Sequence, residues 1–200
     1  VLKCSNISAG LTYITEDSFE VLNSVTINSA LIACWTLEQF DASEDTVSFC
    51  LTKNPGEAIN FDFYEHPGNR IGYYKNGFIY KTDGRKKGQI GIKKNAEPSA
   101  IGFFDIERKL VCIRQNLSSD KEGLYFNIAD NDQVKGPFSA EDTYSIFNSD
   151  ADTSFFELET VGCADVEQER LLGSNLVSLT SFAIFDNKKE LKNWLREVLM

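Results

Sequence analysis

The sequence predicts an all-β fold, an antiparallel β-sandwich followed by one C-terminal α-helix. Short segments in which apolar and polar residues alternate recur along the chain, as in strands with one buried face. Turn sequences rich in Gly, Asn, Asp and Pro separate them at roughly the spacing of sandwich strands. Only the last dozen residues have helical apolar spacing. The 200 residues fit one domain, 1–200, which is long enough to bury a sizeable core.

The N-terminal quarter is expected to form four strands. Two alternating segments and one more continuous apolar run indicate three successive strands, and a fourth lies between a polar turn and the Pro55-Gly56 turn. These expected strands are 11–15, 19–28, 30–37 and 46–52.

The middle of the chain is expected to hold a hairpin and a series of short strands. Asn76-Gly77 is a strong hairpin signal, and it is flanked by the β-prone segments 71–74 and 78–80. Asp83-Gly84 suggests another tight turn. The short strands expected here are 89–92, 100–105, 110–115 and 124–128.

The C-terminal third is expected to alternate strands with polar loops. Strands are predicted at 154–160 and 176–185, with polar loops at 130–143 and 162–174. The first loop is too long for a simple connection, which makes it a candidate binding loop, and residues 139–142 could start a short helix. A helix is predicted at about 187–199, with Asn187 as its cap, Glu190 as the reciprocal partner and an apolar stripe formed by Leu191, Trp194, Leu195, Val198 and Leu199.

Composition disfavours several classes of function. The 30 acidic and 20 basic residues give a formal charge of −10, and nucleic-acid binding requires clustered basic residues. Arg85-Lys86-Lys87 is such a cluster, but a solvated turn is the favoured interpretation over a phosphate site. No apolar run is long enough to span a membrane, and the first residues lack the features of a signal peptide. The five cysteines are widely spaced without a Cys-x-x-Cys pair, so no metal or cofactor is predicted, and Cys34, Cys50 and Cys112 are expected to be small buried hydrophobes.

Two carboxylates in the strand 154–160 are the first candidate site. Side chains alternate between the two faces of a strand, so Phe155, Glu157 and Glu159 share one face, while Phe156 and Leu158 point toward the core. Glu157 and Glu159 would lie about 7 Å apart along the strand, close enough to act on one ligand. The alternative, a solvent-facing sheet surface, is equally favoured.

Other polar residues are weaker candidates. Arg70 could clamp sugar hydroxyls through its planar fork or pair with Glu65. Asp105 and Asn148 could bind a ligand, although a turn role is favoured for both. His66 is expected to be solvated or structural. Trp35 lies in an apolar run and is expected in the core.

Several short motifs carry a family resemblance. From about residue 12 to 185 their order resembles that of an uncharacterised group of Bacteroidetes proteins with a galactose-mutarotase-like supersandwich. The motifs are Tyr13-Ile-Thr-Glu16, Cys34-Trp-Thr-Leu37, Asp62-Phe-Tyr64, Asn69-Arg-Ile71, Asp83-Gly84, Ile90-Gly91, Gly102-Phe-Phe-Asp105, Asn148-Ser-Asp150 and Phe155-Phe-Glu-Leu-Glu159.

The resemblance implies a role for Glu159. Mutarotase-like proteins carry a Leu-Glu-Thr near the end of the domain, and its glutamate is the base that takes a proton from the anomeric hydroxyl. Leu158-Glu159-Thr160 resembles that segment, and Glu157 beside it would raise one carboxyl pKa toward neutral pH. True mutarotases pair this base with histidines, whereas this chain has only His66. Gln89 stands before Ile90-Gly91, where the group often has a basic residue.

Three functions follow as alternatives. The first is carbohydrate binding in a cleft lined by Glu157, Glu159 and loop polar groups, with Arg70, Asp105, Asn148 and Gln89 as further binding candidates. The second is an aldose 1-epimerase with Glu159 as base and His66 or a tyrosine as acid. The third is a non-catalytic interaction module. The resemblance implies a periplasmic or cell-surface location, a sugar or glycan as partner, and a supersandwich that is only partial, because a complete one usually needs more than 200 residues.

Overall fold

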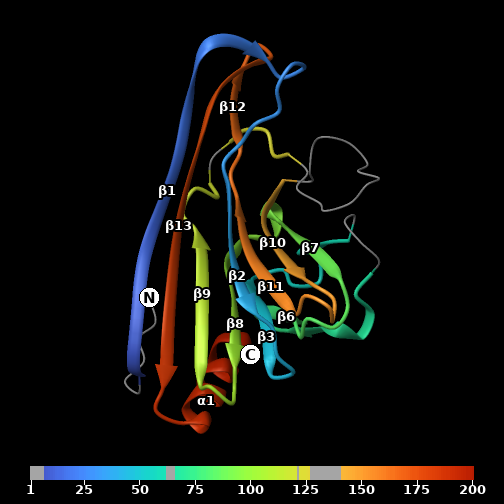
Figure 1. The fold of residues 1–200 in the computed structure, drawn as a ribbon, viewed down its shortest axis with the longest axis vertical. Helices are drawn as coiled ribbons and strands as arrows, with labels where there is room; N and C mark the ends of the chain where they lie inside the picture. The colour runs from blue at the N-terminus through green and yellow to red at the C-terminus, as the bar shows by residue number, and fades with distance from the viewer. Residues whose placement is uncertain (1–6, 62–65, 121, 127–140) are drawn as a thin grey trace.

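The protein is a two-sheet antiparallel sandwich with one helix. The computed structural model describes residues 7–61, 66–120, 122–126 and 141–200 (Figure 1). Every strand pair in both sheets is antiparallel, and the helix is at the C-terminus. The predicted all-β sandwich with a C-terminal helix is therefore confirmed.

The strands divide into an eight-stranded and a five-stranded sheet. In spatial order the eight-stranded sheet is β1 (Ile7–Thr26), β13 (Arg170–Phe185), β9 (Leu110–Asn116), β8 (Pro98–Asp105), β3 (Thr46–Thr52), β6 (Gly77–Lys81) and β5 (Ile71–Tyr74), with β12 (Ala164–Glu167) also paired to β13. The five-stranded sheet is β2 (Trp35–Asp41), β11 (Phe155–Val161), β10 (Asp142–Asn148), β7 (Gly88–Lys93) and β4 (Ile59–Asn60).

The main core fills the space between the sheets. Alternate residues of β3, β8 and β9 meet those of β7, β10 and β11 there, including Cys50, Ile101, Cys112, Ile146 and Leu158. These five side chains are fully buried. Cys50 and Cys112 are thus small core residues as predicted, while Cys34 is only half-buried.

The helix covers the other face of the eight-stranded sheet. Helix α1 (Lys188–Leu199) begins where the Asn187 Oδ1 accepts a hydrogen bond from the Glu190 N–H at 3.0 Å, as the capping pattern predicts. Leu191, Trp194 and Leu195 are buried against Phe49 and Phe185. This second core joins the C-terminal end of β13 to the helix, at the lower end of the molecule in Figure 1.

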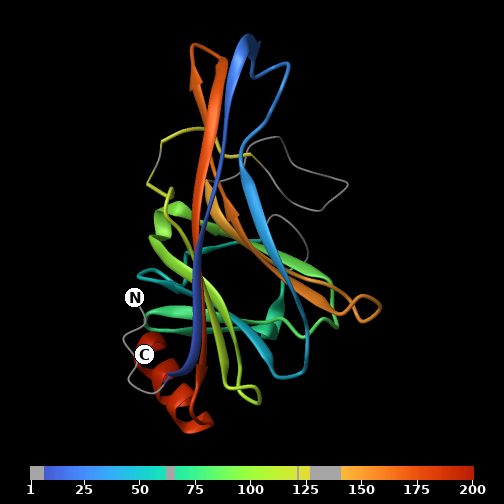
Figure 2. The same cartoon turned by 60° about the vertical axis from the view of Figure 1, so that its left-hand side comes forward.

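The N-terminal strand differs from the prediction. Segments 11–15 and 19–28 belong to one long strand, β1, because pairing with β13 continues through the polar residues Glu16, Asp17 and Ser18. Figures 1 and 2 show β1 and β13 side by side, extending beyond the shorter strands. The expected strand at 30–37 is also wrong in its bounds, since β2 begins only at Trp35.

In the C-terminal third, one predicted loop was wrong and one strand was missed. The expected loop 162–174 contains β12, a tight turn and the start of β13. Its turn residues, Gln168 and Glu169, both have positive φ, which usually requires Asn or Gly, so the usual hairpin signal was absent. Strand β10 was not predicted, although Tyr144 and Ile146 alternate with polar residues. Of the expected strand 124–128, residues 124–126 are described; Leu124 forms an isolated bridge with Ala164, and Phe126 is also a bridge residue. Most of the loop 130–143 lies outside the described residues.

Among the described residues there is neither a membrane-spanning helix nor a cluster of metal ligands. No helix there is long and apolar enough to cross a membrane. No group of three His, Cys, Asp or Glu side chains there could hold a metal ion.

Candidate functional site

The candidate site lies on the outer face of the five-stranded sheet, the face that points away from the eight-stranded sheet. Phe156 and Leu158 of β11 are fully buried in the main core, as predicted. Glu157 and Glu159 alternate with them and therefore share the outer face. The strand register places Ser145 of β10 and Leu37 of β2 directly opposite Glu159. Three strands thus bring their side chains to one carboxyl group.

Glu159 is buried and held by neutral donors. Glu159 is only 1% exposed to solvent. The Trp35 indole N–H donates to Oε2 at 2.9 Å, and the Gln89 amide donates to Oε1 at 3.3 Å. Among the residues that the structure describes, no Lys or Arg pairs with this carboxyl. A buried carboxylate without a cation is costly, so its protonation equilibrium must shift.

The pKa of Glu159 is raised from 4.5 to about 7, and burial is the main cause. The negative charge of Glu157 also acts to raise this pKa, whereas hydrogen bonds from Trp35, Gln89 and Ser145 act to lower it. A carboxyl with this pKa exists in both protonation states near neutral pH, so it can either accept or donate a proton there.

Trp35 lies at the rim of this site rather than in the core. The residue is 45% exposed, which makes the predicted core position wrong. Its indole N–H is bound to Glu159 while much of the ring surface remains accessible. Tryptophan often combines an apolar contact surface with one fixed hydrogen bond in this way. An accessible aromatic surface therefore adjoins the buried carboxyl.

Gln89 is the predicted candidate that the structure places against Glu159. It comes from β7 and is buried, and its amide donates to the Ser145 hydroxyl at 3.0 Å as well as to Glu159. Because Gln89 is neutral, it orients the carboxyl without the strong pKa depression that a lysine or arginine would cause. The departure from a basic residue at this position thus helps to keep the pKa of Glu159 near neutral.

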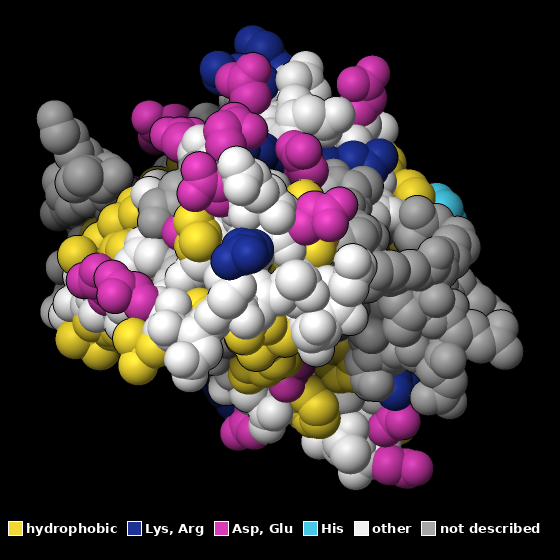
Figure 3. Space-filling model, turned by 90° about the horizontal axis from the view of Figure 1, so that it is seen from above, with side chains coloured by type: hydrophobic (Ala, Val, Ile, Leu, Met, Phe, Trp, Pro, Cys, Tyr) yellow, Lys and Arg dark blue, Asp and Glu magenta, His cyan; other side chains and the backbone are white. Residues whose placement is uncertain are grey.

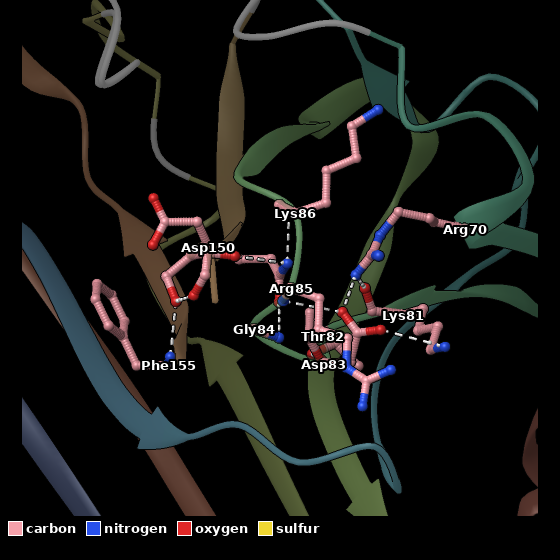
Figure 4. A network of polar contacts seen from close by, with 12 residues as sticks. Arg70, Lys81, Thr82, Asp83, Gly84, Arg85, Lys86, Asp150 and Phe155 are labelled. Carbon is pink, nitrogen blue, oxygen red and sulfur yellow. Dashed lines mark hydrogen bonds and ion pairs between the residues drawn. The ribbon is translucent and has the colours of Figure 1, made fainter. Parts of the chain in front are cut away.

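Arg70 lies in a separate ionic cluster. Its Nη2 donates to Asp83 Oδ1 at 2.6 Å and to the Lys81 carbonyl, while Lys81 Nζ lies 3.2 Å from Asp83 Oδ2 (Figure 4). Burial acts to raise the pKa of Asp83, but the bonds from Arg70 and Lys81 outweigh it and lower that pKa. Glu65, the alternative partner considered for Arg70, lies outside the described residues. Arg70 does not contact Glu159, although Arg70 and Gln89 line the same small hollow.

Asn148 supports the turn between β6 and β7. Its Oδ1 accepts from the Gly84 N–H at 2.9 Å, and its Nδ2 donates to the Lys86 carbonyl at 2.7 Å. Figure 4 shows this turn between Asp83 and Lys86. The amide is fully buried and holds backbone, in keeping with the favoured turn role.

The structure does not bring Asp105 or His66 to Glu159. Asp105 ends β8 in the eight-stranded sheet, where its Oδ1 accepts from the Arg108 N–H at 2.8 Å. His66 is exposed, accepts from the Gly68 N–H at 3.0 Å and stacks on Phe61 with ring centroids 4.2 Å apart. These are the local contacts of a turn residue and a structural histidine, the interpretations that the sequence favoured for them.

Comparison with known proteins assigns the chain to a family. The family of unknown function DUF6786 matches residues 9–191. The chain belongs to this family. Among solved structures it is similar to a candidate aldose 1-epimerase from Escherichia coli K12, with 12% identity and a TM-score of 0.45 over 87% of this chain and 55% of that one. A search of curated proteins gave no match. A Bacteroidetes origin stays a prediction.

This DUF6786 protein also has a buried polar network that the sequence analysis missed. Arg114 of β9 is 1% exposed and lies between the sheets. Its guanidinium binds Glu38 and Thr36 of β2, Thr160 of β11 and Thr180 of β13. Thr36 and Thr160 adjoin Trp35 and Glu159, so the network fixes two of the strands that carry the site, β2 and β11. The sequence signal for this network was the position of Arg114 two residues after Cys112 on the same strand, because residues two apart share one face of a strand.

Proposed function

We propose that this protein binds carbohydrate on the outer face of the five-stranded sheet, with Glu159 bonded to a sugar hydroxyl. The supporting observation is the pairing of a buried carboxyl, whose pKa is raised to about 7, with the exposed ring of Trp35. Sugars present hydroxyl groups around their edge and apolar C–H groups on their ring faces. The ring of Trp35 suits the apolar face, while Glu159 and Gln89 suit the hydroxyls.

The resemblance of Leu158-Glu159-Thr160 to the mutarotase-like segment supports the same residue. The geometry adds Trp35, Gln89 and Ser145 as the groups that orient its carboxyl. In a site of this kind a few fixed polar groups set the orientation of the ligand, and apolar surface supplies contact area.

Tryptophan fluorescence tests the binding proposal. The chain has two tryptophans, and a Trp194→Phe variant leaves Trp35 as the reporter. A glycan array should first identify a ligand, which should then change the Trp35 emission on titration. Glu159→Gln should weaken binding by about tenfold or more, because hydrogen bonds to charged groups contribute about 1.5–3 kcal/mol.

The matched control is Glu167→Gln, an exposed carboxylate on β12 of the other sheet, which should bind like the wild type. Absence of any ligand on the array, or equal affinities for the wild type and Glu159→Gln, would contradict the proposal. Absence of any ligand would favour an interaction module, whereas equal affinities would show that the sugar binds away from Glu159.

A second candidate function, an aldose 1-epimerase, is favoured by the near-neutral pKa of Glu159. The carboxylate would take the proton of the anomeric hydroxyl, the ring would open, and reclosure would give the other anomer. The reaction also needs an acid at the ring oxygen, and His66 does not contact Glu159 in the described structure. Exchange NMR of sugar anomers separates the two functions, since binding without accelerated exchange indicates a binding protein.

A further inference from the structure

Positive charge is concentrated in one part of this acidic chain. Between residues 70 and 94 there are eight Lys or Arg residues and a single acidic one, Asp83, whereas the whole chain has 20 basic and 30 acidic residues. The face of the molecule in Figure 3 shows acidic, basic and apolar side chains interspersed. In the folded structure Arg85 pairs with Glu44 and Lys94 with Glu122, acidic residues from other parts of the chain. The remaining excess of basic over acidic residues in this segment favours an anionic ligand beside it.

A small hollow opens within this positive segment. Its lining includes Arg70, Tyr80, Lys86, Lys87 and Gln89, and its volume is about 10 Å³. That is room for one water-sized group, such as a single oxygen of an anion. Figure 4 shows the side chains of Arg70 and Lys86, two of the lining residues, in one view.

The Nε of Arg70 is a buried donor without a hydrogen-bond partner. The Nη2 of the same guanidinium serves Asp83 and the Lys81 carbonyl. A buried donor without a partner is destabilising, and an oxyanion is its strongest acceptor. Arg70 and Lys81 carry two positive charges and share the single negative charge of Asp83, so these three side chains keep a net positive charge.

Gln89 connects this hollow to the carboxyl site. It lines the hollow and also donates to Glu159 at 3.3 Å. The hollow and the Glu159 carboxyl are therefore joined by one side chain, that of Gln89. Two substituents of one small sugar, an anion in the hollow and a hydroxyl bound to Glu159, would fit this arrangement.

We propose that the hollow formed by Arg70, Tyr80, Lys86, Lys87 and Gln89 is a subsite for an oxyanion carried by the sugar. This inference rests on the proposed carbohydrate site and narrows its ligand to an acidic sugar. The shared chemistry is a carboxylate, sulfate ester or phosphate ester on the ring or its exocyclic carbon. Guanidinium and ammonium groups recognise all three.

Matched sugars test the subsite. Galactose is compared with galacturonate, galactose 6-sulfate and galactose 6-phosphate, and glucose with the corresponding glucose derivatives, using the Trp35 emission of the Trp194→Phe protein. At least one charged sugar should bind about tenfold or more tightly than its neutral parent, and added salt should reduce that preference. The derivative with the largest preference identifies which of the three anions the subsite takes.

Variants of the exposed lysines avoid disturbing the Arg70–Asp83 pair. Lys86→Gln and Lys87→Gln should each reduce the preference for the charged sugar several-fold and leave binding of the neutral sugar unchanged. Lys75→Gln is the matched control, because Lys75 is an exposed lysine of the same segment that does not line the hollow. Equal binding of charged and neutral sugars would overturn the subsite and leave the carbohydrate site standing.

Inorganic anions separate the two proposals if no sugar binds. Sulfate and phosphate are titrated while the arginine Nε–Hε signals are followed by ¹⁵N NMR. A shift of the Arg70 signal that is weakened in Lys86→Gln and Lys87→Gln, but not in Lys75→Gln, supports the anion subsite even where the sugar proposal fails. An Arg70 signal that does not respond to either anion overturns it.

Discussion

At the scale of single residues, Glu159 is a carboxyl group in surroundings that favour its neutral form. Burial raises its pKa most, and the charge of Glu157 acts in the same direction. Trp35, Gln89 and Ser145 donate hydrogen bonds that oppose the rise, but all three are neutral. The balance leaves a pKa of about 7, which suits proton exchange at neutral pH.

This pKa predicts a pH-dependent stability. The folded state holds the proton more tightly than an unfolded chain, whose glutamate titrates near 4.5. The stabilising contribution is therefore complete below about pH 4.5 and is lost as the pH rises through 7, by on the order of 3 kcal/mol. Urea unfolding between pH 4.5 and 8 should show this loss in the wild type and not in Glu159→Gln.

The control for this measurement is Glu157→Gln, which keeps the titrating group. Its loss of stability should occur at a lower pH, because the neighbouring negative charge has been removed. Parallel pH profiles for the wild type and Glu159→Gln would contradict the assigned pKa.

At the scale of elements, the buried network around Arg114 connects β9 and β13 of one sheet to β2 and β11 of the other. Arg114→Met should lower the free energy of unfolding by about 3–5 kcal/mol, because it leaves Glu38 without its cationic partner. The double variant Arg114→Met/Glu38→Met should recover a large part of that loss. Urea unfolding measures both, and a single variant as stable as the wild type would show that the network does not hold the sheets together.

The turn between β6 and β7 predicts a second element-scale effect. Gly84 has φ +64°, and a Cβ there would lie 2.7 Å from the Ala42 Cβ and 2.8 Å from the Ser154 Cα. Gly84→Ala should therefore destabilise the fold by about 2 kcal/mol or more, from the left-handed backbone and the crowding together. Gly56→Ala is the control, since nothing lies within 4 Å of its Cβ position. Equal thermal unfolding midpoints for the two variants would contradict this role of Gly84.

Local patterns predicted many elements because they depend on neighbouring residues. Alternation gave the faces of β11, Asn76-Gly77 gave the β5–β6 hairpin, and Asn187 gave the start of the helix. The β12–β13 hairpin was missed because Gln168 and Glu169 adopt a turn that residues of their type seldom form. The continuity of β1 was missed because it depends on its pairing with β13.

At the scale of the whole molecule, the candidate site is assembled from four strands, of which β2 and β7 are distant in sequence from the consecutive strands β10 and β11. Trp35 and Glu159 are separated by 124 positions, and Gln89 and Glu159 by 70. The sequence indicated Glu159 from its own strand and from a family resemblance. It could not indicate Trp35 or Ser145, because only the order β2–β11–β10–β7 places them against that carboxyl.

The distribution of charged residues is also a property of the whole molecule. The acidic chain concentrates basic residues between positions 70 and 94, beside the hollow that Gln89 shares with the carboxyl site. The Arg85-Lys86-Lys87 turn, interpreted from sequence as solvated, thus contributes two lysines to that hollow.

The raised pKa of Glu159 and its contact with sugar are tested most directly by a ¹³C NMR titration of its side-chain carboxyl. The signal is assigned by comparison with Glu159→Gln, and the titration is repeated with a sugar found to bind. A midpoint near pH 7 is expected in the free protein, and a displaced midpoint when the sugar is present. A midpoint near 4.5 that does not respond to the sugar would contradict both the raised pKa and the sugar contact.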